Sequence, residues 1–385
     1  RRAYDSTSRP VRQQADCQEV RPDACCALTA GIERKMLIIK ALRDRVMKRK
    51  IGILFVLLIS LAASAQEKRM AVVEFSTSYL RLKPDYESPL ETQELMGTVV
   101  EIVREESYWR EVVTPQPYRA WCTDQGLVEM NAEELKAYEE APKVMYKELY
   151  GHIYSEPSCR AQTICDLVGG DLLRLAQPAR NPQAGLRGKW TKVMLPSGKT
   201  GYVPTKEIKP HTGFVSIAMG EGSSESISPE TTEAIIAEAE KLLGAPYLWG
   251  GMSAKGVDCS GLVRICHIMN GIHLPRNASQ QVKCGERIEI PLQDRDDNEG
   301  AAHGDRTESL KEDMTRRISN LQRGDLVFFG TPASDERPIR ITHVGIYLGN
   351  NRIIHSSHRV RINSLIPGDP DYYENAHRLV AAIRL

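Results

Sequence analysis

The sequence of 385 residues is poor in aromatic side chains and has almost no net charge. Phe, Trp and Tyr make up 6% of it, and the formal net charge is +1. A chain so balanced has no overall field that would attract nucleic acid or an anionic membrane, so we expect neither as a partner. The sequence also lacks a CxxC pair and an HExxH segment, which mark many zinc sites. We therefore expect no metal and no cofactor.

Long apolar runs are also missing, and residues 51–61 are too short to span a bilayer as an anchor. This run lies between a basic tetrapeptide and an Ala-Ser-Ala segment, an order typical of a secretory signal peptide. We predict a signal peptide over residues 47–65, a mature chain that begins at Gln66, and an exported protein, periplasmic or extracellular, without a membrane anchor. Residues 1–46 are then interpreted as upstream sequence translated from a start site placed too early.

Six cysteines follow the predicted cleavage site, but the mature chain is large enough not to need disulfides, so we predict no disulfide framework. Cys159 and Cys165 are the closely spaced pair, and whether they form a disulfide stays open.

Two stretches, residues 67–138 and 143–210, look like copies of each other. Both contain short alternating strands broken by Gly and Pro turns, which predicts two small all-β barrels. Four residues recur in the same order, with Pro84, Gly97, Trp109 and Trp121 matched by Pro157, Gly170, Trp190 and Tyr202. This repeat resembles the bacterial SH3-like domain. Residues 211–227 are rich in Gly and Ser and are predicted to be a linker.

Residues 228–385 predict a third domain of the α+β class. Ser228 is an expected N-cap, and helices are predicted up to Gly244 and over 259–269. Strands are predicted later in the chain, with short turns between them. The polar stretch at about 291–319 is interpreted as a solvated surface insertion.

The residues that could carry out catalysis are Cys259, His343 and His355. Cys259 follows a Gly-rich segment at the start of a predicted helix, where unpaired N–H groups and the helix dipole favour a thiolate. The two histidines flank a predicted hairpin, so one can face the thiol as general base while the other orients it.

The series PYLWGG, DCSG, LPR, GDLVFF, HVGIYLG and IIH resembles the NlpC-type family of bacterial cell-wall cysteine peptidases, over about residues 228–385. The resemblance implies a papain-like α+β catalytic domain preceded by the two SH3-like barrels. It also implies that Cys259 is the nucleophile, His343 the base and His355 the orienting residue. The residues that it places at the oxyanion or in the substrate pocket are Tyr247, Trp249, Asp258, Ser260 and Ser279.

Two SH3-like domains ahead of such a domain resemble the γ-D-glutamyl-L-diamino-acid endopeptidases, also called dipeptidyl-peptidase VI. In these enzymes a Tyr and an acidic residue of the first barrel bind the free amine of an N-terminal L-Ala. Tyr118 matches the Tyr, while Glu87, Glu91 and Glu94 all compete for the acidic place. The implied substrate is a murein peptide, L-Ala-γ-D-Glu-diamino acid, whose diamino acid stays open, and we expect a monomer.

Other functions remain open from the sequence. Cys259, His343 and His355 could instead be zinc ligands of a hydrolase. A protein that only binds the cell wall would keep the barrels without needing the thiol and both histidines. An acyltransferase or amidase could use the same nucleophile, and a hydrolase of intact peptidoglycan stems could use the same fold.

Overall fold

The computed structural model describes Lys40, Arg43, Met47 and residues 68–177, 182–217, 219–220, 227–291, 303–334 and 337–385. Contacts divide the chain into two units, Arg1–Glu67 and Lys68–Leu385, and every element named below belongs to the second. Nearly all of the expected signal peptide and of the upstream segment lies outside the described residues, as does Gln66. Within the described residues, no helix is long and apolar enough to cross a membrane.

Two seven-stranded antiparallel sheets follow one another along the chain. The strands of the first are β1 (Arg69–Val73), β2 (Thr77–Arg81), β3 (Leu90–Leu95), β4 (Val99–Glu106), β5 (Trp109–Val113), β6 (Arg119–Thr123) and β7 (Leu127–Met130). Those of the second are β8 (Lys143–Tyr146), β9 (Tyr150–Tyr154), β10 (Thr163–Val168), β11 (Leu172–Leu175), β12 (Trp190–Met194), β13 (Thr200–Pro204) and β14 (Ile208–His211). The order β3-β2-β6-β5-β4-β1-β7 recurs as β10-β9-β13-β12-β11-β8-β14, so the sequence repeat is also a repeat of topology.

Each of the two sheets encloses its own apolar cluster, which confirms the expected all-β parts. Val100 and Val112 are among the buried residues of the first cluster, and Leu167 and Val193 among those of the second. Helix α2 (Ala132–Glu140) connects the sheets, and a capping box at Asn131 begins it. A short helix, α3 (Pro182–Gly185), lies in the segment that is longer in the second copy.

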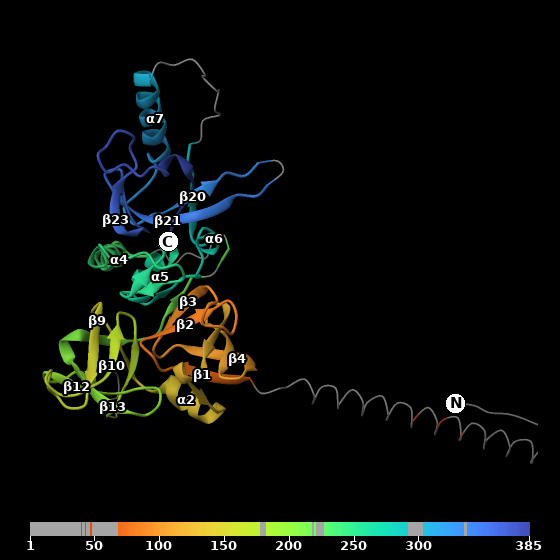
Figure 1. Cartoon of the computed structure of the whole chain (residues 1–385), viewed down its shortest axis with the longest axis vertical. Coiled ribbons are helices and arrows are strands. Elements are labelled where there is room, and N and C mark those ends of the chain that lie inside the picture. The colour runs from red at the N-terminus through yellow and green to blue at the C-terminus, as the bar shows by residue number, and fades with distance from the viewer. Residues whose placement is uncertain are drawn as a thin grey trace, which may run out of the picture. The chain divides into compact units, whose positions relative to one another are not determined.

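The remaining part of the chain is α+β, as predicted. Its helices are α4 (Pro229–Lys241), α5 (Cys259–Ile268), α6 (Ala278–Gln281) and α7 (His303–Arg317). Its short strands are β15 (Val215–Ser216), β16 (Met252–Ser253), β17 (Gly256–Val257) and β18 (Ile272–His273). The main sheet contains β19 (Glu286–Ile288), β20 (Leu326–Thr331), β21 (Arg340–Gly349), β22 (Arg352–Ser357), β23 (Arg359–Ser364) and β24 (Leu379–Arg384). Its order is β19-β24-β20-β21-β22-β23, and Figure 1 shows this sheet together with α4 to α7.

Helix α5 is the central element of this domain because all ten of its residues are buried. Leu262 and Ile265 lie in the largest apolar cluster, together with Val344 and Ile354 of the main sheet. A helix that is buried all round is held by packing rather than by an amphipathic face. Its first residue, Cys259, is therefore placed by the whole core.

The polar insertion at about 291–319 is not entirely a solvated loop. Its second half forms α7, whose Met314 is 2% exposed, and Ile318 just beyond the helix is 4% exposed. Both side chains pack in a second apolar cluster with Tyr373 and Leu379. The sequence interpretation underestimated these two apolar residues because charged residues surround them.

Strand β3 of the first sheet attaches to the α+β domain through three consecutive residues. Thr92 accepts a hydrogen bond from Arg276 Nε at 2.8 Å, and Gln93 Oε1 accepts one from Met252 N at 2.7 Å. Glu94 forms a buried ion pair with Arg264 at 3.2 Å. Buried polar groups of this kind are costly to separate, so the first sheet is fixed beside the N-terminal end of α5.

Candidate active site

Cys259 lies at the N-terminal end of α5 and is 9% exposed. The N-cap residue Asp258 begins the helix, because its Oδ1 accepts a hydrogen bond from Gly261 N at 2.7 Å. The thiol faces the backbone N–H groups of Ser260 and Val344, which stabilise its anionic form. Val344 directly follows His343, so the sulfur lies close to the part of β21 that carries the residue expected to be its base.

His343 on β21 and His355 on β22 are in direct contact. Nε2 of His343 lies 2.7 Å from Nδ1 of His355, and the two rings meet edge to face with centroids 5.0 Å apart. Gly345 stands between them on β21, where an added Cβ would lie 3.2 Å from the Cβ of His355. The glycine therefore leaves room for the two imidazoles, and the structure brings the two predicted histidines together.

Asn363 on β23 extends this contact and defines its direction. Its side-chain nitrogen donates to Asp371 O at 2.6 Å, so its oxygen is the atom that faces Nε2 of His355, at 2.9 Å. Nε2 of His355 must then carry the proton, and Nδ1 of His355 accepts from Nε2 of His343. The chain of bonds leaves Nδ1 of His343 without a proton, which is the state that a base for Cys259 requires.

Burial keeps all three groups neutral. It raises the pKa of the Cys259 thiol to about 11, with the negative charge of Asp258 as a smaller cause. It lowers the pKa of His343 to about 3 and that of His355 to about 4. Desolvation thus outweighs the helix dipole that was expected to favour a thiolate. The arrangement is suited to a thiol that transfers its proton to His343 as it attacks.

Asp258 is also bound by Arg276, which is 2% exposed. The guanidinium donates to both carboxylate oxygens, at 3.0 and 2.6 Å, and to Ser260 Oγ at 2.9 Å. Gly250 N donates to the same carboxylate at 2.9 Å. A buried bidentate salt bridge has a fixed geometry, so this one salt bridge holds together the loops on both sides of Cys259.

The structure separates the three acidic residues that compete as partners of Tyr118. The Tyr118 hydroxyl donates to Glu91 Oε2 at 2.5 Å, while Glu94 is engaged by Arg264 and Glu87 is exposed in a loop. Burial, followed by the contact with Glu91, raises the pKa of Tyr118 to about 12. Glu91 is therefore the carboxylate that accompanies Tyr118.

Tyr247 and Trp249 lie on the loop that precedes Cys259. Burial raises the pKa of Tyr247 to about 12, and Cys259 adds to this shift as a neighbouring negative charge. Trp249 is 65% exposed. At the next residue, Gly250, an added Cβ would lie 2.9 Å from Leu90 O, so this loop packs closely on the strand that carries Glu91.

Ser279 is placed differently from the other predicted pocket residues. It is exposed on α6, whereas the preceding Ala278 is 9% exposed and belongs to the apolar cluster around α5. No hydrogen bond ties the Ser279 side chain to another described residue.

The sequence interpretation missed four residues that surround the histidines and the cysteine. Arg276 stands in the LPR motif, which could have indicated it. Asn363, Arg361 and Tyr373 carry no such signal, because only the pairing of β22 with β23 and the return of the chain bring them to the site. The Tyr373 ring lies 5.6 Å from that of His343 and 4.6 Å from that of His355.

The contacts of His355 also bear on the zinc alternative. Both of its ring nitrogens are engaged, one by His343 and the other by Asn363, so neither is free to bind a metal together with Cys259. Within the described ranges, no group of three His, Cys, Asp or Glu side chains is arranged to hold a metal ion.

The structure also answers the question of a disulfide between Cys159 and Cys165, because both are free thiols.

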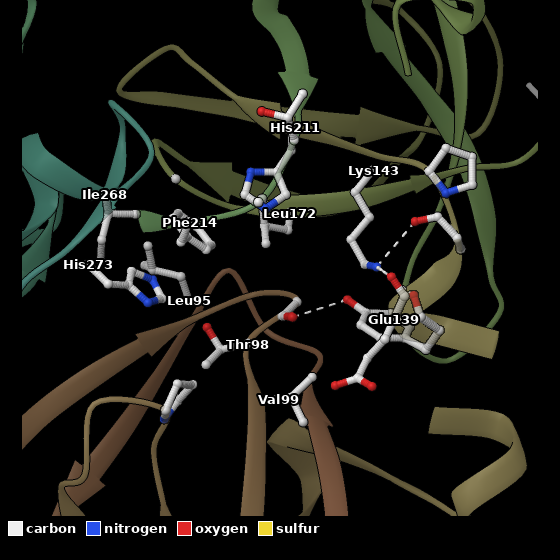
Figure 2. A pocket seen from close by; sticks show the side chains of 18 of the residues that line it. Leu95, Thr98, Val99, Glu139, Lys143, Leu172, His211, Phe214, Ile268 and His273 are labelled. Atoms are coloured by element: carbon white, nitrogen blue, oxygen red, sulfur yellow. Dashed lines mark hydrogen bonds between the residues drawn. The ribbon is translucent and has the colours of Figure 1, made fainter. Parts of the chain in front are cut away.

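A cavity of about 740 Å³ lies near the opposite end of α5 from Cys259. Figure 2 shows Leu95 and Val99 on one side of it, with Leu172, Phe214 and His211 on the other. Glu94, one of the three acidic candidates, lines this cavity, whereas Cys259, His343, His355 and Tyr118 do not. The chemistry of the cysteine and the histidines is therefore located elsewhere.

Residues 244–376 match the NlpC/P60 family. The chain is 26% identical over 317 residues to dipeptidyl-peptidase 6 of Lysinibacillus sphaericus, a match that covers 81% of this chain and 98% of the relative. It is 25% identical over 294 residues to a γ-D-glutamyl-L-lysine dipeptidyl-peptidase of Bacillus cereus, covering 74% of this chain and 73% of the relative. The range that matches the family, residues 244–376, contains Cys259, His343 and His355.

The crystal structure of an NlpC/P60 family protein from Bacillus cereus is similar in fold. It superimposes with a TM-score of 0.59 at 21% identity and covers 82% of this chain and 99% of its own. An NlpC/P60 endopeptidase from Photobacterium damselae subsp. piscicida gives a TM-score of 0.53 at 14% identity, covering 81% of this chain and 72% of its own. Both likenesses extend beyond the family domain into the all-β part.

Proposed function

Because the C-terminal domain of this chain is an NlpC/P60 domain, we propose that the protein is a cysteine peptidase of cell-wall peptides. The bond that it hydrolyses would be the one between the γ-carbonyl of D-Glu and a diamino acid, in peptides with a free N-terminal L-Ala. The observation that carries this proposal is the chain of hydrogen bonds from His343 through His355 to Asn363, with the Cys259 thiol facing the N–H of Val344, the residue after His343. Dipeptidyl-peptidase 6 and the γ-D-glutamyl-L-lysine dipeptidyl-peptidase support the choice of bond by their names.

The reaction follows from the protonation states. The Cys259 sulfur attacks the γ-carbonyl carbon while its proton moves to Nδ1 of His343. The oxyanion that forms lies near the first N–H groups of α5 and the Tyr247 hydroxyl, which stabilise it by hydrogen bonding. When the C–N bond breaks, His343 returns the proton to the leaving amine, and a thioester remains on Cys259. Water then hydrolyses the thioester, with His343 again as base, and L-Ala-γ-D-Glu is released.

The same proposal assigns Glu91 and Tyr118 to the amine of the substrate. Asp258 and Ser260 would lie along D-Glu, with Trp249 as an exposed wall and Ser279 at the outer edge. The loop at Gly250 packs on β3, which carries Glu91, and Gly250 N also binds Asp258, the residue before Cys259. A cleft closed at that point holds two residues before the scissile bond, and its closing group is a carboxylate. An ammonium fits there, whereas a glycan-linked stem has none.

The experiment is a paired rate measurement on L-Ala-γ-D-Glu-L-Lys and on its N-acetylated form, with products identified by mass spectrometry. We expect release of L-Ala-γ-D-Glu, and a loss in kcat/KM of roughly 30-fold or more on acetylation, because a desolvated charged contact is lost. Equal rates would show that the cleft is open and would favour a hydrolase of intact wall. The variant Cys259→Ala should cleave neither peptide.

A further inference from the structure

Arg361 on β23 stands directly opposite His355 in the strand pairing. Directly opposed residues of an antiparallel pair project to the same face of a sheet, so the guanidinium lies on the side of the two histidines. Its positive charge contributes to the lowered pKa of both His343 and His355, after the larger effect of burial. It also lies near Tyr373, as does Arg378.

Neither arginine has an acidic partner within the described residues. In the part of the chain that the structure describes, the half-buried Arg361 donates a hydrogen bond from Nη2 to Ser357 Oγ at 3.4 Å, and its buried Nε has no hydrogen-bond partner. Arg378 Nε donates to Gly330 O at 3.3 Å and forms no ion pair. A guanidinium presents a rigid fork of N–H donors that matches the geometry of a carboxylate or phosphate. An anion brought by a ligand would supply what the chain does not.

Near Tyr118 the remaining charge is negative rather than positive. Arg276 is neutralised there by Asp258, and Glu91 remains as the charged group beside Tyr118. The positive charge of Arg276 opposes the rise in the pKa of Tyr118 and Tyr247. The charge of Arg361 opposes the rise in the pKa of Tyr373. The site is therefore negative at one end and positive beside the histidines.

We propose that Arg361 forms a subsite for a carboxylate on the leaving diamino acid. This inference rests on the proposed function, because it takes the leaving amine to lie against His343, the group that protonates it. The carboxylate has two possible sources. It is the α-carboxylate where the diamino acid ends the peptide, or the side-chain carboxylate where the diamino acid is meso-diaminopimelate.

The test measures kcat/KM of the full-length chain on four peptides of the form L-Ala-γ-D-Glu-diamino acid. They are the L-Lys tripeptide, its C-terminal amide, and the meso-diaminopimelate tripeptide amidated at either the α or the side-chain carboxylate. Wild type is compared with Arg361→Gln, Arg361→Lys and the control Arg160→Gln, which removes one exposed charge from the second sheet domain. Calorimetric binding of the same peptides to Cys259→Ala, with and without Arg361→Gln, gives a readout that needs no hydrolysis.

We expect Arg361→Gln to lower kcat/KM and affinity on the order of 10- to 100-fold for peptides that carry the bound carboxylate, and to leave the matching amide nearly unchanged. The amide on which the loss disappears identifies the α or the side-chain carboxylate as the source. Arg361→Lys should retain part of the discrimination. An equal loss on acid and amide, or no loss on either, would overturn the subsite. Failure of wild type to cleave any of the peptides would instead refute the proposed function, while the binding data still decide on Arg361.

Discussion

Nε2 of His343 and Nδ1 of His355 are 2.7 Å apart, and Asn363 on the far side of His355 decides which of them carries the proton. The direction of this hydrogen-bond chain is fixed by Asp371 O, which accepts from the Asn363 amide nitrogen. Asn363, two hydrogen bonds away from His343, thereby sets the tautomer of the proposed base.

Replacing Asn363 by Ala should therefore lower kcat more than it changes KM. The His355 ring would lose the partner of its Nε2 and could present a proton to His343, which disfavours the tautomer needed at Cys259. We expect kcat to fall about 10-fold or more, as for other orienting residues behind a catalytic histidine. Steady-state kinetics on the L-Lys tripeptide measure it, with Asn320→Ala as a control because its amide bonds only Glu289 O at an exposed site. A wild-type kcat in Asn363→Ala would contradict the assigned tautomer.

The reactivity of Cys259 should rise steeply with pH. Because burial raises its pKa to about 11, the thiolate appears only as the pH climbs towards that value. His343, with a pKa lowered to about 3, stays neutral through the neutral range and provides no cation to stabilise the thiolate. Alkylation of Cys259 by iodoacetamide, followed by mass spectrometry, should accelerate about tenfold per pH unit between about pH 7 and pH 10.

A free cysteine in solution, with a pKa of about 8.5, levels off earlier and is the reference for this experiment. A rate that stays constant through the neutral range would mean that Cys259 and His343 form a stable ion pair. Cys266 is 0% exposed and should remain unmodified throughout.

The sequence allowed the α+β class, the two all-β parts and the placement of the cysteine at a helix start to be predicted, because each depends on local patterns. Ser228 and Pro229 begin α4, and Asp258 begins α5, as capping preferences indicate. The motifs that resemble the NlpC-type family added the prediction that His343 is the base for Cys259.

What could not be predicted depends on contacts between distant segments. Arg276 lies 184 positions from Thr92 and 18 from Asp258, and only the fold brings both to one guanidinium. The sequence left three acidic residues open near Tyr118, because strand register decides which of them faces it. The pKa of Cys259 was expected to be lowered by the helix, and burial, which sequence does not show, reversed the direction.

Removing the Arg276 side chain should destabilise the protein strongly. Arg276→Ala would leave Asp258 buried without its partner and would also release Thr92 of the first sheet. Breaking a buried pair in this way typically costs about 3–5 kcal/mol of the free energy of unfolding. Chemical denaturation measures the loss, and Arg323→Ala is the matched control.

Arg323 pairs with Glu233 in an exposed setting, where the side chains are 40% and 57% accessible. Its removal should cost no more than about 1 kcal/mol. Similar losses in the two variants would mean that the pair between Arg276 and Asp258 does not hold the loops around Cys259.

Glu91 should discriminate between free and acetylated substrate amines, and Glu87 should not. In wild type the substrate ammonium would exchange its bound water for contacts with the Glu91 carboxylate and the Tyr118 hydroxyl. Glu91→Gln removes the negative charge while keeping the shape of the side chain. We expect Glu91→Gln to lower kcat/KM for the free-amine tripeptide about 30-fold or more, with little effect on the acetylated peptide. Tyr118→Phe should cost about 1 kcal/mol, because the carboxylate remains. Glu87→Gln is the control, since Glu87 is exposed and donates its backbone N–H to Asp85 at 3.0 Å without a side-chain partner. A loss in Glu87→Gln as large as in Glu91→Gln would mean that a general field, and not the contact of Glu91 with Tyr118, selects the amine.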